Sequence, residues 1–260
     1  STQFTVVPQN LGADADYVVT GTWSKKALAE AKKLGTPRVA GSSAETGFDR
    51  IPTELDFSSS ASYVHLTSNN TVAGTQFQSF PKTEAPIVCD MSSDILSRPL
   101  DLDSFGLIYA GAQKNLGPAG VTLVLIRKEL LARSSDSLPT MIDYRTHATK
   151  GSRFNTPPTF PIYVLGLVAK WLEGQGGLAG MAERNERKAA KLYAAIDELD
   201  LYTGAVQTES RSLMNVTYKL TREGLDAAFL EGAKACGLVG LKGHRSVGGM
   251  RASIYNAMPE

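Results

Sequence analysis

Short apolar runs of strand length alternate with helix-like runs along roughly the first half of the chain. The run 24–35, for example, is rich in Ala, Leu and Lys, which favour helix. Strands that are separated by helices or loops predict a mostly parallel sheet that is covered on both faces. In such a sheet the functional site is expected at the carboxyl ends of the strands. The strand-like runs lie at 17–21, 62–69, 87–90, 106–111 and 121–126.

A polar segment interrupts this alternation. Residues 137–160 are rich in Ser, Thr and Pro, which predicts an exposed excursion. An apolar helix is expected to begin at Pro161, and the glycine-rich run 173–177 is expected to end it. A strongly helical run then occupies 181–199.

The C-terminal part of the sequence predicts a second, smaller unit. Strand-like runs at 214–220 and 250–256 flank a helix-like run at 224–237. The fold class is therefore expected to be α/β, with a large domain over 1–180 and a small C-terminal α/β domain over 181–260.

Composition excludes several function classes. The 260 residues include 27 basic and 26 acidic side chains, so the net charge of +1 gives no basic field for nucleic acid or a membrane surface. No apolar stretch reaches the about 18 residues of a transmembrane helix, and no signal peptide is visible. Cys89 and Cys236 lack metal-site spacing. We therefore expect no metal, free thiols, and a reducing, cytoplasmic setting.

The most informative residue is Lys114, between the apolar runs 105–111 and 120–126. The small residues around it suit close approach of a ligand. A loop lysine is ordinarily solvated, but one held on a tight turn between core strands can anchor a phosphate or attack a carbonyl. Asn115 follows the lysine and no glycine directly precedes it, so the nucleotide loop G-x-x-x-x-G-K-[ST] does not fit. The carbonyl nucleophile remains, and it requires a carbonyl cofactor.

Two further residues end apolar strands. Asp90 closes the run 85–90, where a carboxylate could pair with the pyridinium nitrogen of pyridoxal phosphate. Taken alone, Asp90 also fits a turn or a helix N-cap. Trp23 ends the run 17–23, where its ring could stack on a cofactor or simply pack under the following helix.

Together these residues resemble a known family, the phosphoserine aminotransferases. These are pyridoxal-phosphate enzymes of the aspartate aminotransferase fold. The segments AGAQKNLGPAG (110–120) and KGHRSVGGMRASIYNAMP (242–259) are specific to that family rather than to aminotransferases in general. The resembling stretches span nearly the whole chain, at 17–23, 89–101, 109–120, 153–160 and 241–259.

The resemblance implies roles around the cofactor ring. Lys114 would be joined to the cofactor aldehyde and would later move the substrate proton. Asp90 would keep the ring nitrogen protonated, and Trp23 would lie against the ring face. Thr71 matches the family hydroxyl that bonds the ring 3′ oxygen, although it also fits an ordinary turn threonine.

The resemblance also implies contacts to the cofactor phosphate. Ser1 and Thr2 match the end of the family's phosphate loop, at a helix N-terminus that favours an anion. Gln113 matches a further phosphate contact. Asn155 and Thr156 match contacts that arrive from the other subunit of a homodimer, and on their own they fit turn chemistry equally well.

The resemblance also implies that one histidine and two arginines, His244, Arg245 and Arg251, face the substrate. Arg gives a planar fork for a carboxylate, and His adds a donor for phosphate. The resemblance assigns Arg251 to the α-carboxylate, and His244 with Arg245 to the substrate phosphate or the glutamate side-chain carboxylate. Such residues are otherwise common in surface salt bridges.

The activity implied is ping-pong transamination. Glutamate would give its amino group and leave as 2-oxoglutarate, and 3-phosphooxypyruvate would become O-phospho-L-serine, a step of serine biosynthesis. Some family members also aminate a longer phosphorylated keto acid on the route to vitamin B6. The alternatives are another aminotransferase or desulfurase of the same fold, whose lysine lies in a Ser-His-Lys-like setting, and a catalytically inert truncated core.

The inert core is considered because members of the family extend beyond Ser1 and beyond Glu260. The missing head would carry a His-Arg pair that reaches the substrate phosphate in the partner subunit, and glycines of the cofactor-phosphate loop. We expect those segments to be absent, cleaved or disordered.

Overall fold

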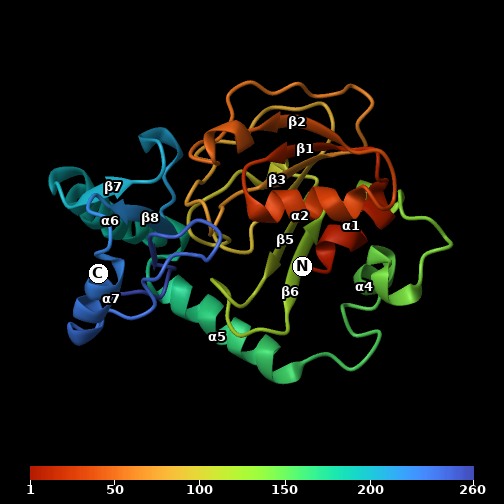
Figure 1. Cartoon of the computed structure of the whole chain (residues 1–260). Coiled ribbons are helices and arrows are strands. Elements are labelled where there is room, and N and C mark those ends of the chain that lie inside the picture. The colour runs from red at the N-terminus through yellow and green to blue at the C-terminus, as the bar shows by residue number, and fades with distance from the viewer.

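The computed structural model describes residues 1–260 and contains two β-sheets of unequal size (Figure 1). The larger sheet has six strands in the order β2-β1-β3-β4-β5-β6. Strands β1 to β5 are parallel, and β6 is antiparallel to β5, so the predicted mostly parallel sheet is confirmed. The bounds are β1 (Asp16–Val19), β2 (Arg38–Ser42), β3 (Val64–Thr67), β4 (Ile87–Asp90), β5 (Leu107–Gly111) and β6 (Thr122–Ile126).

The central strands β1, β3 and β4 are buried along their whole length because both faces of the sheet are covered. Successive side chains of a strand point to opposite faces. Tyr17 and Val19 accordingly pack in the core beneath α1 (Gln3–Leu11) and α2 (Thr22–Ala31), whereas Val18 packs in the core on the other face.

The two edge strands depart from the sequence prediction. The run 121–126 was expected to be a buried strand, but β6 is half-buried, and Leu125 has 41% of its surface exposed. The reason is that β6 pairs only with β5 and has no neighbour on its outer side. The opposite edge strand, β2, was not predicted because its sequence RVAGS has exposed positions and no apolar run.

The smaller sheet is antiparallel, in the order β7-β8-β9. Its core is formed by side chains such as Ile196, Val216, Tyr218 and Met250. The predicted order of strand, helix and strand over 214–256 is confirmed, although β7 was not predicted. The bounds are β7 (Tyr202–Gly204), β8 (Asn215–Leu220), α7 (Asp226–Ala235) and β9 (Met250–Ser253).

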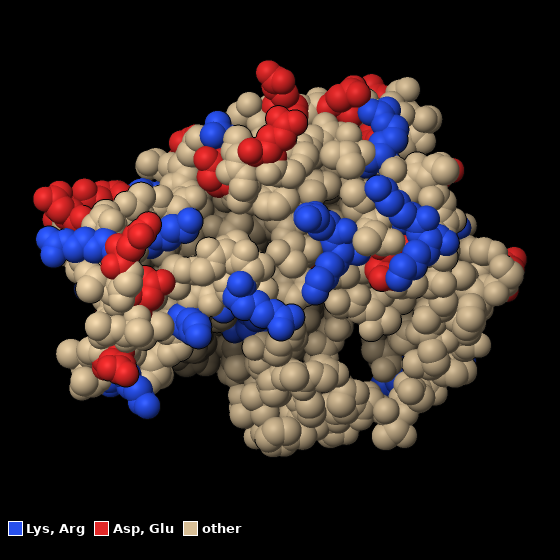
Figure 2. Space-filling model, in the orientation of Figure 1, with Lys and Arg blue, Asp and Glu red and all other residues tan.

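Helix α5 (Thr159–Gly174) runs along one side of the molecule from the large sheet to the small one (Figure 1), and α6 (Gly177–Glu198) follows it after a short break. No helix is long and apolar enough to cross a membrane. Basic and acidic side chains are mixed over the visible face in Figure 2. The remaining short helices are η1 (Ala44–Thr46), η2 (Leu102–Ser104), α3 (Lys128–Leu131), η3 (Thr140–Ile142), α4 (Tyr144–Thr149) and η4 (Thr208–Ser210).

A histidine is buried at the centre of the large sheet. The Nε2 atom of His65 lies 2.9 Å from the Tyr109 hydroxyl, and its ring stacks on Tyr17 with 4.9 Å between centroids. Its Nδ1 atom has no hydrogen-bond partner. Burial lowers the pKa of His65 to about 3, so the ring is neutral in the folded protein at neutral pH.

This burial predicts acid sensitivity. Histidine in an unfolded chain has a pKa of about 6.5, so the unfolded state binds more protons than the folded state between that value and about 3. Stability is therefore lost as the pH falls through this window, by up to about 1.4 kcal/mol per pH unit from this group. His65→Gln should flatten that loss in denaturant unfolding between about pH 7 and about pH 4.5. His147→Gln is the control, and an unchanged slope in His65→Gln would contradict the assignment.

Candidate active site

Lys114 lies in the turn that joins β5 to the antiparallel β6, as the sequence predicted. The turn is closed by hydrogen bonds from the amides of Leu116 and Gly117 to the Ala112 carbonyl. Gly117 has φ = 152° and Gly120 has φ = 107°. A residue with a Cβ atom rarely adopts these values, so the shape of the turn depends on glycine.

The lysine faces a cavity of about 330 Å³. The cavity lies at the carboxyl ends of the parallel strands, which is the expected place for a site in such a sheet. It brings together six of the residues that the sequence singled out, with others that it did not. The lining residues are Ser1, Thr2, Phe4, Trp23, Thr67, Asn69, Asp90, Ser92, Ser93, Gly111, Gln113, Lys114 and Thr122.

Asp90 is the last residue of β4, and only 7% of its surface is exposed. Its Oδ1 atom accepts hydrogen bonds from the amide and the hydroxyl of Ser92, at 3.0 and 2.6 Å. Its Oδ2 atom accepts none from the chain. Burial raises the pKa of Asp90, and the Ser92 bonds and the Lys114 charge oppose that rise. The bonds to Oδ1 thus orient the carboxylate, and Oδ2 remains available to a ligand.

The amine of Lys114 lies 5.5 Å from the centroid of the Trp23 ring. Burial lowers the pKa of Lys114, and the charge of Arg251 lowers it further, whereas Asp90 and Asp94 oppose the shift. The lowered pKa increases the fraction of neutral amine, which is the nucleophilic form.

Trp23 is fixed by a residue that is distant in sequence. Its indole Nε1 donates to Thr71 Oγ1 at 3.0 Å. The hydroxyl hydrogen of Thr71 remains free to donate elsewhere. The sequence suggested a ring contact or a turn role for Thr71, and the structure adds this bond to the tryptophan.

The N-terminus of α1 opens into the same cavity through Ser1 and Thr2, and Gln113 lines it as well. Helix N-terminal amides and the helix dipole favour an anion. Asn155 and Thr156 are exposed and lie in the segment before α5. Neither of them lines the Lys114 cavity of this chain.

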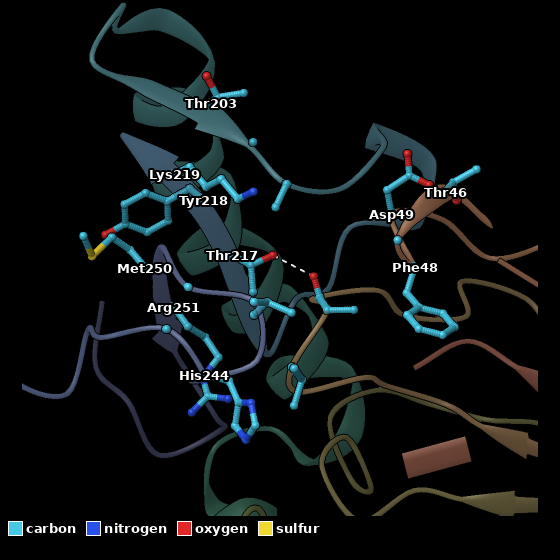
Figure 3. A pocket seen from close by; sticks show the side chains of 18 residues that line it. Thr46, Phe48, Asp49, Thr203, Thr217, Tyr218, Lys219, His244, Met250 and Arg251 are labelled. Atoms are coloured by element: carbon cyan, nitrogen blue, oxygen red, sulfur yellow. Dashed lines mark hydrogen bonds between the residues drawn. The ribbon is translucent and has the colours of Figure 1, made fainter. Parts of the chain in front are cut away.

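A second, larger cavity of about 480 Å³ lies between the two sheets. Figure 3 shows His244 and Arg251 on the small-sheet side of this cavity and Phe48 on the opposite side. A hydrogen bond joins the two sides: the hydroxyl of Thr217, in the small sheet, donates to the Ala73 carbonyl at 2.8 Å. Although this cavity is larger, it lacks the half-buried amine and the buried carboxylate of the Lys114 cavity.

Arg251 connects the two cavities. It lines the larger cavity, and its Nη1 atom donates to the Thr71 carbonyl at 2.8 Å. Thr71 in turn holds Trp23 of the smaller cavity. His244 contacts the Ser246 hydroxyl at 2.7 Å, whereas Arg245 is exposed and lines neither cavity.

Two polar groups beside Asp90 were not predicted from the sequence. Ser92 holds Asp90 and also accepts a hydrogen bond from the Gly111 amide at 3.0 Å. Thr67 ends β3 with a buried hydroxyl that has no partner. Ser92 could have been found, because a serine two residues after an aspartate often bonds back to it. Thr67 gave no local signal.

Comparison with known proteins adds independent findings. The family model "Aminotransferase class-V" matches residues 1–260. The sequence is 57% identical over 265 residues to the phosphoserine aminotransferase of Geobacillus kaustophilus, covering 100% of this chain and 74% of that protein.

Solved structures agree with the sequence matches. One phosphoserine aminotransferase structure, described by radiation damage to its Schiff base, has a TM-score of 0.95 and 52% identity. It is matched over 99% of this chain and 73% of its own. Pyridoxal-phosphate-bound phosphoserine aminotransferase from Trichomonas vaginalis has a TM-score of 0.92 and 39% identity, over 99% of this chain and 76% of its own.

Proposed function

The chain belongs to the class-V aminotransferases and, within them, to the phosphoserine aminotransferases, and we propose that it moves the amino group of glutamate to 3-phosphooxypyruvate. The products are O-phospho-L-serine and 2-oxoglutarate, which places the reaction in serine biosynthesis. The observation that carries the proposal is a half-buried amine, Lys114, facing one cavity with the buried carboxylate of Asp90 and the ring of Trp23.

The residues of this cavity fit pyridoxal phosphate. Asp90 Oδ2 accepts no hydrogen bond from the chain, and the hydroxyl of Thr67 is buried without a partner. Such groups are costly to bury unless a ligand satisfies them. The N-terminus of α1 meets the same cavity and suits a phosphate.

When bound, pyridoxal phosphate supplies an aldehyde that takes up amino groups and a ring that withdraws electrons. Lys114 is proposed to hold it through Nζ and, once displaced by the substrate amine, to move the proton at the substrate Cα. The lowered pKa of Lys114 favours the neutral amine that both roles need.

Two residues are proposed to fix the ring. Asp90 would accept the ring N–H on Oδ2, with Ser92 holding Oδ1 in place. The positive ring nitrogen would offset the burial that raises the pKa of Asp90 and keep the carboxylate ionised. Trp23, oriented by Thr71, would lie against the ring face, and the free hydrogen of Thr71 would reach the ring oxygen.

The cofactor phosphate is proposed to bind at Ser1, Thr2 and Gln113. Asn155 and Thr156 would complete the phosphate site of the other subunit in a homodimer. Their exposure outside the Lys114 cavity supports this proposal.

The homodimer also has support from α5. Phe160 and Tyr163 expose 71% and 63% of their surfaces. Figure 2 shows few charged side chains on the surface over this helix. Exposed apolar patches of this kind mark interaction sites.

Light scattering should give about twice the chain mass of 27.8 kDa. A monomer at all concentrations would exclude an active site that is shared between two subunits.

We propose that the substrate lies between a large domain, 1–180, and a small domain, 181–260. Arg251 would bind the α-carboxylate, because its contact with Thr71 brings it beside the residue that holds Trp23. His244 and Arg245 would bind the phosphate or the glutamate side chain. The buried Cys89 and exposed Cys236 are free, which suits the proposed reducing, cytoplasmic setting.

The first test adds pyridoxal phosphate and then glutamate to the 260-residue chain. The bound cofactor should give an absorbance band that bleaches with glutamate and returns with 3-phosphooxypyruvate but not with pyruvate.

Lys114→Ala should lose the lysine-bound band and turnover, because no other amine is delivered to the cavity, while its circular dichroism stays unchanged. Lys150→Ala is the exposed-lysine control. A band that never bleaches in the unmodified chain would favour the inert core, and turnover in Lys114→Ala would refute the role of the lysine.

A second test separates the anion-binding residues. Arg245→Ala should raise KM for 3-phosphooxypyruvate at least about tenfold, because a charge-assisted bond to phosphate is lost. The KM for glutamate should change less. Steady-state kinetics of the overall reaction, with each substrate varied in turn, measure both values, and equal losses would reassign Arg245.

A further inference from the structure

Three buried asparagines hold one short stretch of backbone, residues 95–97. They come from three separate elements: Asn115 from the Lys114 turn, Asn185 from α6 and Asn256 from the segment after β9. The Nδ2 atoms of Asn115, Asn256 and Asn185 donate to the carbonyl oxygens of Ile95 at 2.7 Å, Leu96 at 2.9 Å and Ser97 at 3.1 Å, respectively.

The asparagines also bond to one another. The backbone amide of Asn256 donates to Asn115 Oδ1 at 3.0 Å. The Nδ2 atom of Asn185 donates to Asn256 Oδ1 at 2.9 Å. The three side chains and the three carbonyls therefore form one connected network, which we call the asparagine cluster. Buried networks of this kind rigidify the groups that they join.

The backbone held by the cluster is strained at one residue. Leu96 has φ = 59°, a left-handed value that a bulky residue adopts only when its surroundings enforce it. Its carbonyl accepts from the Asn256 side chain. Strain that is maintained by contacts from distant elements is often found at functional sites.

Three of the four parts of the cluster are close in sequence to a residue of the proposed active site, and the fourth, Asn185, ties two of them together from α6. Asn115 directly follows Lys114, Asn256 follows Arg251 by one short segment, and residues 95–97 follow Asp90 through a single turn. Because these segments are short and their ends are bonded together, movement of one is passed to the others. The cluster joins the lysine turn directly to the segment that follows the strand of the arginine.

We propose that Asn115, Asn185 and Asn256 are positioning residues that set the spacing of Lys114 and Asp90 from Arg251. The proposal rests on the proposed function. A substrate held by Arg251 must present its Cα to the lysine amine, and a misplacement of about 1 Å can cost about 10²-fold in rate. Loss of the cluster should therefore reduce kcat more than it raises KM.

The test compares Asn256→Asp with Asn10→Asp. Aspartate keeps the shape of asparagine but cannot donate to the Leu96 carbonyl. Asn10 is an equally buried control, because its Nδ2 donates to two carbonyls at 2.9 and 2.8 Å and its Oδ1 accepts two bonds. It lies at the far end of α1 from the cavity. Both variants are expected to lose similar thermal stability.

The first readout is hydrogen exchange of the cofactor-free chain. Asn256→Asp should raise exchange of the amides of residues 112–117, which lie about 140 positions away in sequence, by about tenfold or more. The second readout is kinetic. In the same variant kcat should fall at least about tenfold, with a smaller change in KM for glutamate. Asn10→Asp should change neither readout.

Unchanged exchange at 112–117 in Asn256→Asp would overturn the proposal, and so would equal loss of kcat in the two variants. These outcomes differ from failure of the proposed function. If the unmodified chain formed no lysine-bound cofactor, the proposed function would fail, while the exchange of the cofactor-free variants would still decide whether the cluster controls the lysine turn.

Discussion

The site depends on one half-buried amine and one buried carboxylate that face the same cavity without forming an ion pair. Burial lowers the pKa of Lys114 and raises that of Asp90, so it disfavours the charged form of each group. A cavity of about 330 Å³ adjoins both groups. A ligand that offers a carbonyl to the amine and a positive nitrogen to the carboxylate relieves both costs at once.

The large sheet supplies this arrangement through its topology. Parallel strands bring the ends of β3, β4 and β5 to one edge, and the reversal into β6 places the lysine there on a short turn. The N-terminus of α1 meets the same edge. The small sheet then brings Arg251 against Thr71, so the residues proposed for the cofactor and for the substrate come from different sheets.

Much of this could be predicted from the sequence because its signals are local. Asp90 ends β4 and Lys114 follows β5, as predicted, and strand ends converge in a parallel sheet. Trp23 was expected to end a strand, but β1 ends at Val19 and Trp23 lies in the first turn of α2. The edge strands β2 and β7 could not be predicted, since their exposed faces remove the apolar pattern. The bond from Trp23 to Thr71 and the asparagine cluster join residues far apart in the chain, and no periodicity or spacing encodes such contacts.

We propose that the amine of Lys114 is the group that binds the cofactor aldehyde. The most direct measurement is borohydride reduction of the chain after incubation with pyridoxal phosphate, followed by proteolysis and mass spectrometry. A reduced cofactor is expected on the peptide that contains Lys114 and none on peptides of exposed lysines such as Lys33. A cofactor label on other lysines, with Lys114 unmodified, would contradict it.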